Sequence, residues 1–95
     1  MIQIEDRTAR VLGPMSFDEA GRLFRDGIAA IRTGISHFDL HAVTQADSAG
    51  LAVLLAWCRT AAAAGTTLRF EHVPVSLLSL ADLYDVKAFL PLAQH

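Results

Sequence analysis

The 95-residue sequence is long enough for a single domain with a modest hydrophobic core. Its net charge of -2 and its scattered basic residues exclude the concentrated positive charge that binding to nucleic acid needs. Hydrophobic residues make up 53% and charged residues 19% of the chain. An average soluble domain has about 45–50% and about 25%. So small a domain cannot bury all of this apolar surface by itself, and we expect a partner protein or a homodimer.

A membrane-spanning helix needs about 18 consecutive apolar residues, and no apolar run in the sequence approaches that length. The longest, from Ala49 to Cys58, stops at Arg59. Residues 1–5 lack the basic and apolar regions of a signal peptide, so we expect a cytoplasmic protein without direct membrane insertion. The single cysteine, Cys58, excludes an internal disulfide and agrees with a reducing compartment.

Residues 1–12 are predicted to form two short strands joined by a turn at Asp6-Arg7. Ile2 and Ile4 alternate with polar residues, as in a strand with one buried face. Gly13-Pro14 is then expected to break the pattern.

The first helix is predicted from Phe17 to Arg32, where apolar residues recur at helical spacing. Ser16 and Glu19 match a capping box, in which each side chain binds the other residue's backbone amide. Thr33-Gly34 ends the helix. The apolar residues at this spacing are Phe17, Ala20, Phe24, Ile28 and Ile31.

The second half of the chain continues the alternation of strands and helices. Asp47 and Ser48 are good residues for starting a helix, because their side-chain oxygens accept unpaired amide protons of a first turn. The predicted elements are a strand at Ile35–Val43, a helix at Ser48–Ala64 closed by Gly65, a strand at Thr66–His72, a helix at Val75–Leu83, and a short apolar tail at Val86–Leu92 that forms one helical turn.

The order of these elements predicts a mixed α/β (α+β) fold. A hairpin followed by alternating helices and strands favours a mixed sheet of about four strands with parallel crossovers. We expect the three to four helices mainly on one face of this sheet, with the other face partly open.

The second helix is apolar on every side, since no polar residue occurs from Leu51 to Cys58. Such a helix is normally covered all round, yet the sheet can cover one stripe only. A second stripe carries Val53 and Trp57. Either the other helices cover this stripe, or it forms an exposed docking surface, for which tryptophan is well suited.

With these elements placed, the chain resembles the STAS domain family, which includes the bacterial anti-sigma factor antagonists. The resemblance rests on an Asp-Leu pair in a strand, Asp39-Leu40, followed by Asp47-Ser48-Ala49-Gly50-Leu51 at the start of a helix. Within the family, the second half is most similar to the MlaB-like subunit of the Mla phospholipid-transport ABC complex. The segments that support this are Leu54-Leu55-Ala56-Trp57, Gly65, Pro74 with Leu77, Leu80 to Tyr84, and Leu90-Pro91.

The resemblance implies a STAS fold and a non-catalytic cytoplasmic subunit. Such a subunit binds the ATPase of the transporter and supports its assembly and activity, which maintains lipid asymmetry of the outer membrane. The alternative that the family offers is an anti-sigma factor antagonist regulated by phosphorylation of Ser48. Anti-sigma factor antagonists usually carry a second hydroxyl residue after the phosphorylated serine, and this chain has Ala49 there. That departure favours a docking role for Ser48 over a kinase-controlled switch.

We therefore predict a partner-binding surface around the start of the second helix, and Ser48 as its possible phosphorylation site. Phe24 and Arg25 of the first helix are expected to flank it, with Arg25 able to reach a partner carboxylate. The predicted partner-binding residues are Asp47, Ser48, Ala49, Gly50, Val53, Trp57, Phe24 and Arg25.

No catalytic residue, metal site or cofactor is expected. Asp39 and Asp47 could be read as an acid–base pair, but no nucleophile or oxyanion donor accompanies them in the sequence. The four histidines show no metal-ligand spacing, and Cys58 lies in the apolar stripe as a core residue. The chain has no Gly-x-x-x-x-Gly-Lys phosphate loop, so ATP hydrolysis would belong to the partner.

Overall fold

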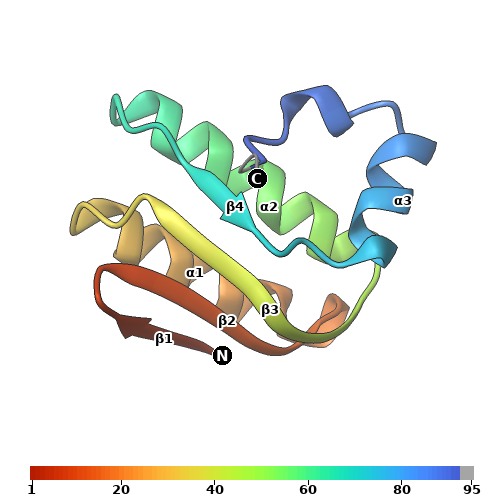
Figure 1. Ribbon diagram of the computed structural model, residues 1–95, viewed down its shortest axis with the longest axis horizontal. Coiled ribbons are helices and arrows are strands. Elements are labelled where there is room, and N and C mark those ends of the chain that lie inside the picture. The colour runs from red at the N-terminus through yellow and green to blue at the C-terminus, as the bar shows by residue number, and fades with distance from the viewer. Residues whose placement is uncertain (93–95) are drawn as a thin grey trace.

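The computed structural model describes residues 1–92, which form a four-stranded sheet with helices on one of its faces (Figure 1). This confirms the predicted mixed α/β fold. The elements in chain order are β1 (Ile2–Glu5), β2 (Thr8–Met15), α1 (Phe17–Arg32), β3 (His37–Ala46), α2 (Ser48–Ala63), β4 (Arg69–Glu71), α3 (Val75–Leu83) and the 3-10 turn η1 (Lys87–Phe89).

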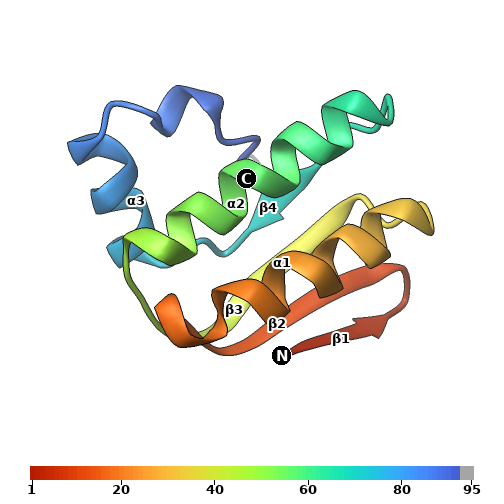
Figure 2. The same ribbon diagram turned by 180° about the vertical axis from the view of Figure 1, so that it is seen from behind.

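The strands lie in the order β1-β2-β3-β4, the same order as in the sequence. β1 pairs antiparallel with β2, whereas β2, β3 and β4 run parallel. Parallel neighbours need a crossover, and α1 and α2 supply the two crossovers. Both helices cover the same face of the sheet, and the other face is open, as predicted (Figures 1 and 2).

The predicted hairpin and its turn are present. Asp6 and Arg7 have φ values of 49° and 65°. Two central residues with positive φ are the mark of a type I′ turn, whose twist matches that of the flanking strands. The sheet therefore begins with a tight two-residue turn, although Asp-Arg is not a pair that this turn usually selects.

The predicted break at Gly13-Pro14 is wrong, because β2 continues to Met15. The pairing of β2 with β3 shifts register between Gly13 and Met15, and Gly13 has a φ of 81°. Pro14 lacks an N–H group and lies at this shift, where the ladder is interrupted. The irregular pairing lets the strand tolerate a residue that regular pairing would reject.

The predicted capping box at the start of α1 is also wrong. The Ser16 side chain makes no capping hydrogen bond, and the Glu19 carboxylate lies 3.6 Å from Arg22 instead. The backbone N–H of Phe17 donates to Asp47, 30 residues further along the chain, at 3.0 Å. A carboxylate from another loop therefore takes the place of the local serine.

The core lies between the sheet and the two covering helices. Phe38 of β3 is at its centre, with the ring of Trp57 at 4.8 Å and the ring of Phe70 at 6.1 Å. All three side chains are at most 1% exposed. The tilted Phe38–Trp57 pair and the edge-on Phe38–Phe70 pair add to the free energy gained by removing these rings from water. This cluster fixes α2 above β3 and β4, and so fixes the position of the Asp47–Gly50 segment.

Candidate functional site

Asp47 joins the N-termini of the two covering helices. Its Oδ1 accepts hydrogen bonds from the backbone N–H groups of Ala49 at 2.9 Å and Gly50 at 3.3 Å. Its Oδ2 accepts from the N–H of Phe17 at 3.0 Å. Asp47 is thus the N-cap of α2 and an anchor for α1, which confirms its predicted role as a cap or loop anchor.

These hydrogen bonds stabilise the charged form of the carboxylate. The bond from the Phe17 N–H contributes most, and together with those from Gly50 and Ala49 it lowers the pKa of Asp47 below its ordinary value. Asp47 is therefore held as an anion by backbone donors. Its lone pairs are used in structure, which leaves it poorly placed to act as a general base.

Ser48 is the first residue of α2 and is exposed. Its hydroxyl makes no hydrogen bond within residues 1–92. The side chain is therefore open to a partner or to a modifying enzyme. Ala49 follows it and is half-buried.

Gly50, one of the predicted partner-binding residues, is buried in the structure. It lies against the end of β2, and a Cβ added to it would collide with the backbone oxygen of Met15. A glycine is required here because the first turn of α2 passes so close to another backbone. Its part in the motif is to seat α2, which leaves the surface to its neighbours.

The predicted exposed stripe with Val53 and Trp57 is wrong. Val53 is 5% exposed and Trp57 is 0% exposed. The Trp57 indole fits over Gly27 of α1, which has no side chain to exclude it, and its Nε1–H donates to the Phe24 carbonyl at 3.2 Å. The first alternative therefore holds for this stripe, since α1 covers it. Trp57 supports the surface from beneath.

An apolar groove of about 430 Å³ runs along the outer side of this helix pair. We call it the α1–α2 groove. Ala49 lies at the Ser48 end, and Val53 lies in the floor. Phe17 and Phe24 are 79% and 38% exposed, so aromatic rings of α1 flank the groove. Its lining residues are Phe17, Ala20, Gly21, Phe24, Ala49, Ala52, Val53, Ala56 and Arg59.

Phe24 and Arg25 are both exposed at this surface. Arg25 is exposed, and its Nη1 lies 3.5 Å from the position that a Cβ on Gly21 would take. The guanidinium thus folds back over a residue that lines the groove. Sequence reasoning missed six residues that line the groove, which are Phe17, Ala20, Gly21, Ala52, Ala56 and Arg59. A signal for Phe17 was its position at the first turn of α1, where a side chain often extends past the core.

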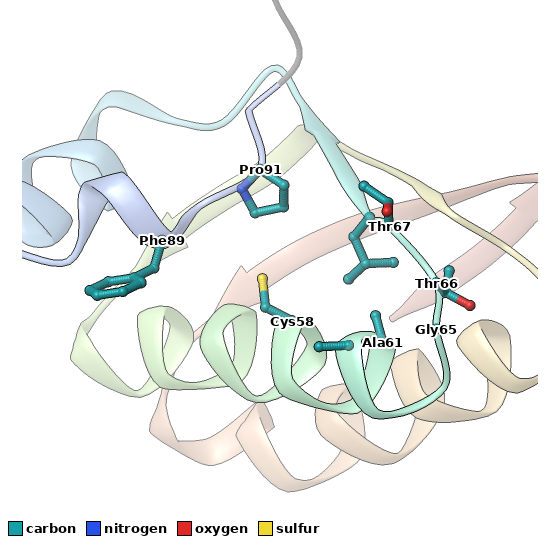
Figure 3. Close-up of a pocket in the computed structure, with 9 residues that line it drawn as sticks. Cys58, Ala61, Gly65, Thr66, Thr67, Phe89 and Pro91 are labelled. Carbon is teal, nitrogen blue, oxygen red and sulfur yellow. The ribbon is translucent and has the colours of Figure 1, made fainter.

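A second hollow of about 430 Å³, which we call the C-terminal hollow, lies between α2 and the C-terminal segment (Figure 3). Cys58 points into it, opposite Phe89 and Pro91. Burial raises the pKa of the Cys58 thiol to about 11, against a smaller lowering effect of Arg59. The thiol is therefore protonated at neutral pH, which is unfavourable for a nucleophile.

The open face of the sheet holds a separate polar cluster. Partial burial acts to raise the pKa of Asp39, but hydrogen bonds from the His41 backbone N–H at 2.9 Å and with the His72 ring at 3.0 Å outweigh it. The pKa of Asp39 is therefore lowered. Asp39 and Asp47 have different hydrogen-bond partners, so the structure does not assemble them into an acid–base pair.

Residues 1–92 hold no group of three or more His, Cys, Asp or Glu side chains that could bind a metal ion. Within the same residues, no helix combines the length and the hydrophobicity that crossing a bilayer would require.

Comparison with known proteins identifies solved structures with a similar fold. No curated protein matches the sequence. The structure is similar to the crystal structure of a candidate anti-sigma factor antagonist from Thermotoga maritima, with a TM-score of 0.76 and 12% identity over 100% of this chain and 86% of that chain. It is also similar to the anti-sigma factor antagonist SpoIIAA in its unphosphorylated form, with a TM-score of 0.66 and 16% identity over 100% of this chain and 87% of that chain.

At 12% and 16% identity, these similarities establish a shared fold only. The family is established by the sequence itself. Residues 4–92 match the family described as "Mlab, STAS domain". The match includes the Asp47-Ser48-Ala49-Gly50-Leu51 motif and both helices of the α1–α2 groove. The chain therefore belongs to the Mlab (MlaB-like) STAS domain family.

Proposed function

We propose that this chain is a non-catalytic subunit that binds and supports the ATPase of a phospholipid-transporting ABC complex. It would act on the cytoplasmic side, as a peripheral component of the transporter. Membership of the MlaB-like family supports this assignment. The observation that carries it is the apolar α1–α2 groove beside Ser48, which an isolated domain leaves exposed to water.

The exposed apolar area of this groove favours binding. Covering it would remove the rings of Phe17 and Phe24 from water, and rings of this size contribute strongly at interface centres. The buried Trp57 holds α1 and α2 in fixed relation beneath the groove. The surface is therefore preorganised, which reduces the entropy lost on binding.

Binding alone can raise the activity of an ATPase if it favours one state of that enzyme. A bound protein shifts an equilibrium only as far as it contacts one state better than another. We infer that the subunit stabilises the assembled ATPase. Hydrolysis itself would take place in the partner, because the chain has no phosphate loop.

The chemistry of the groove end supports a binding role over a catalytic one. The hydroxyl of Ser48 has no histidine or carboxylate bonded to it within residues 1–92, and a serine nucleophile needs an adjacent base. The nearest carboxylate in sequence, Asp47, is occupied by three backbone N–H donors.

Ser48→Asp tests this proposal. A carboxylate in the first turn of α2 suits the helix dipole, so the fold should persist. The same charge inside an apolar interface loses its hydration, and affinity for the ATPase should fall at least about tenfold. Co-purification with the ATPase subunit and ATP turnover measure the effect.

Thr67→Asp is the control for the added charge, because Thr67 is exposed beyond the C-terminal end of α2, at the opposite end of that helix from Ser48. It should bind like the wild type. Undiminished binding by Ser48→Asp would remove Ser48 from the interface. If the wild-type chain changes neither assembly nor turnover of the ATPase, the proposed mechanism fails.

The second candidate is an anti-sigma factor antagonist regulated by phosphorylation of Ser48. The similarity to two structures of that class favours keeping it. Mass spectrometry of the protein isolated from its own cells separates the two functions. Recovery with transporter subunits and without phosphate supports the transporter role, whereas phosphate on Ser48 and recovery with a serine kinase support the antagonist.

A further inference from the structure

The α1–α2 groove carries positive charge that the chain itself does not balance. Arg59 of α2 lines the groove, and Arg25 of α1 lies over Gly21 in its wall. Neither arginine has an ion-pair partner within residues 1–92. Arg22, by contrast, lies 3.6 Å from Glu19.

In the part of the chain that the structure describes, none of the carboxylates of α1, which are Asp18, Glu19 and Asp26, forms an ion pair with Arg25 or Arg59. Glu19 is shared with Arg22, and Asp26 lies on another side of the helix, beside Ile2 and Ile4 of β1. The groove is therefore an apolar surface with two unpaired guanidinium groups.

A partner that covers the groove must satisfy these groups. Arg59 also lines a third, apolar hollow together with Leu55, Cys58 and Phe89, so apolar surface lies on both sides of it. Covering α2 removes water from the guanidinium, and a desolvated charge without a counter-charge is costly. A carboxylate matches the planar fork of arginine and restores the lost hydrogen bonds.

The shape of the groove selects the form of the partner segment. The groove lies between two helices whose backbone groups are already paired within each helix, so it offers no strand edge to an extended peptide. A helix can instead place apolar side chains along such a groove at a spacing of three or four residues.

From these observations we infer that the groove binds an amphipathic helix of the ATPase, with carboxylates opposite Arg25 and Arg59. This inference rests on the proposed function and names the chemistry of the partner. The apolar face of the helix supplies area, and the two ion pairs set its register and direction.

The test measures the affinity of the full chain for the ATPase subunit at low and at high salt. Arg25→Glu and Arg59→Glu, singly and together, place like charges opposite the expected carboxylates. The double variant should bind at least about tenfold more weakly at low salt, and its affinity should rise with salt while that of the wild type falls, because salt screens the new repulsion. The affinity of Arg59→Lys should lie between those of the wild type and of Arg59→Glu, because lysine keeps the positive charge and lacks the planar fork of arginine.

Arg69→Glu is the control for a change of net charge. Arg69 is exposed on β4, away from the groove, so this variant should bind like the wild type. Thermal unfolding of every variant checks that folding is preserved. Reversing acidic residues of the ATPase one at a time should find a position where lysine restores binding to the Arg59→Glu variant.

The outcomes separate the inference from the function on which it rests. If the wild type binds and the double variant binds equally well, the charge pairing is overturned while the ATPase partnership stands. If the wild type does not bind the ATPase, the proposed function fails, and the inference of an ATPase helix in the groove fails with it. If the wild type forms a homodimer that Arg59→Glu disrupts, the groove belongs to a second copy and the inference is overturned.

Discussion

Asp47 shows how a single side chain can organise the surface that we propose as functional. Its carboxylate accepts hydrogen bonds from N–H groups in the first turn of α2 and from the first N–H group of α1. The α1 donor, Phe17, is 30 residues away from Asp47 in the sequence. Ser48 and Phe17 are the residues next to these bonds. The position of both therefore depends on the charge of Asp47.

This arrangement predicts a pH-dependent effect of Asp47→Asn. An amide oxygen can accept on one side only, so the variant should be less stable than the wild type at neutral pH. The folded-state pKa of Asp47 is lowered, so its contribution is present above the ordinary pKa of 3.8 and is lost as the pH falls through the folded-state value. The difference between variant and wild type should therefore shrink below pH 3.8.

Urea unfolding at neutral and acidic pH measures this difference. Asp26→Asn is the control, since Asp26 is exposed and makes no hydrogen bond within residues 1–92. Its free energy of unfolding should equal that of the wild type at both pH values. A deficit of Asp47→Asn that stays constant with pH would show that the carboxylate charge is not what joins the helices.

At the scale of elements, the groove exists because α1 and α2 approach closely over Gly27. The Trp57 indole occupies the space where a side chain of residue 27 would stand. Gly21, on the same helix, faces the groove and has only the flexible end of Arg25 near it. Gly27 is therefore required by the packing of Trp57, whereas the packing around Gly21 would accept a small side chain.

This difference predicts opposite effects for the same substitution. Gly27→Ala should destabilise the protein by about 1–3 kcal/mol, because the new methyl group collides with Trp57. Gly21→Ala should stabilise it by up to about 1 kcal/mol, since alanine is the better helix former and its methyl group makes only an ordinary contact with the Arg25 side chain. Chemical denaturation of both variants checks this, and equal effects would contradict the packing of Trp57 over Gly27.

Much of the element pattern could be predicted because local chemistry sets it. The observed bounds of α1 and α3 are the predicted ones, since Gly34 ends one helix and Pro74 precedes the other. The hairpin and the cap at Asp47 are local as well. These features depend on residues within a few positions of each other.

The surface could be predicted only in part, because it depends on contacts between distant residues. An apolar helix gives no sign of which stripe α1 will cover, and here the empty place at Gly27 decides it. The Asp47–Phe17 bond, likewise, displaces a capping box that the local sequence at Ser16 favours. Ser48, Ala49, Phe24 and Arg25 lie at the predicted surface, whereas Gly50, Val53 and Trp57 lie beneath it.

At the scale of the whole molecule, the exposed phenylalanine side chains lie in two separate places. Phe17 and Phe24 flank the α1–α2 groove, and Phe89, 71% exposed, lies at the C-terminal hollow. The open face of the sheet is polar at Asp39 and His72. The central claim is that the first of these surfaces binds the ATPase.

The affinity of the ATPase subunit for Phe24→Asp, compared with Phe89→Asp, tests this claim most directly. Both changes replace an exposed phenylalanine with aspartate, so the changes in net charge are equal, and thermal unfolding of both variants checks that the fold persists. Phe24→Asp should weaken binding at least about tenfold while Phe89→Asp binds like the wild type. Full binding by Phe24→Asp, with loss of binding by Phe89→Asp, would contradict the account and move the interface to the C-terminal hollow.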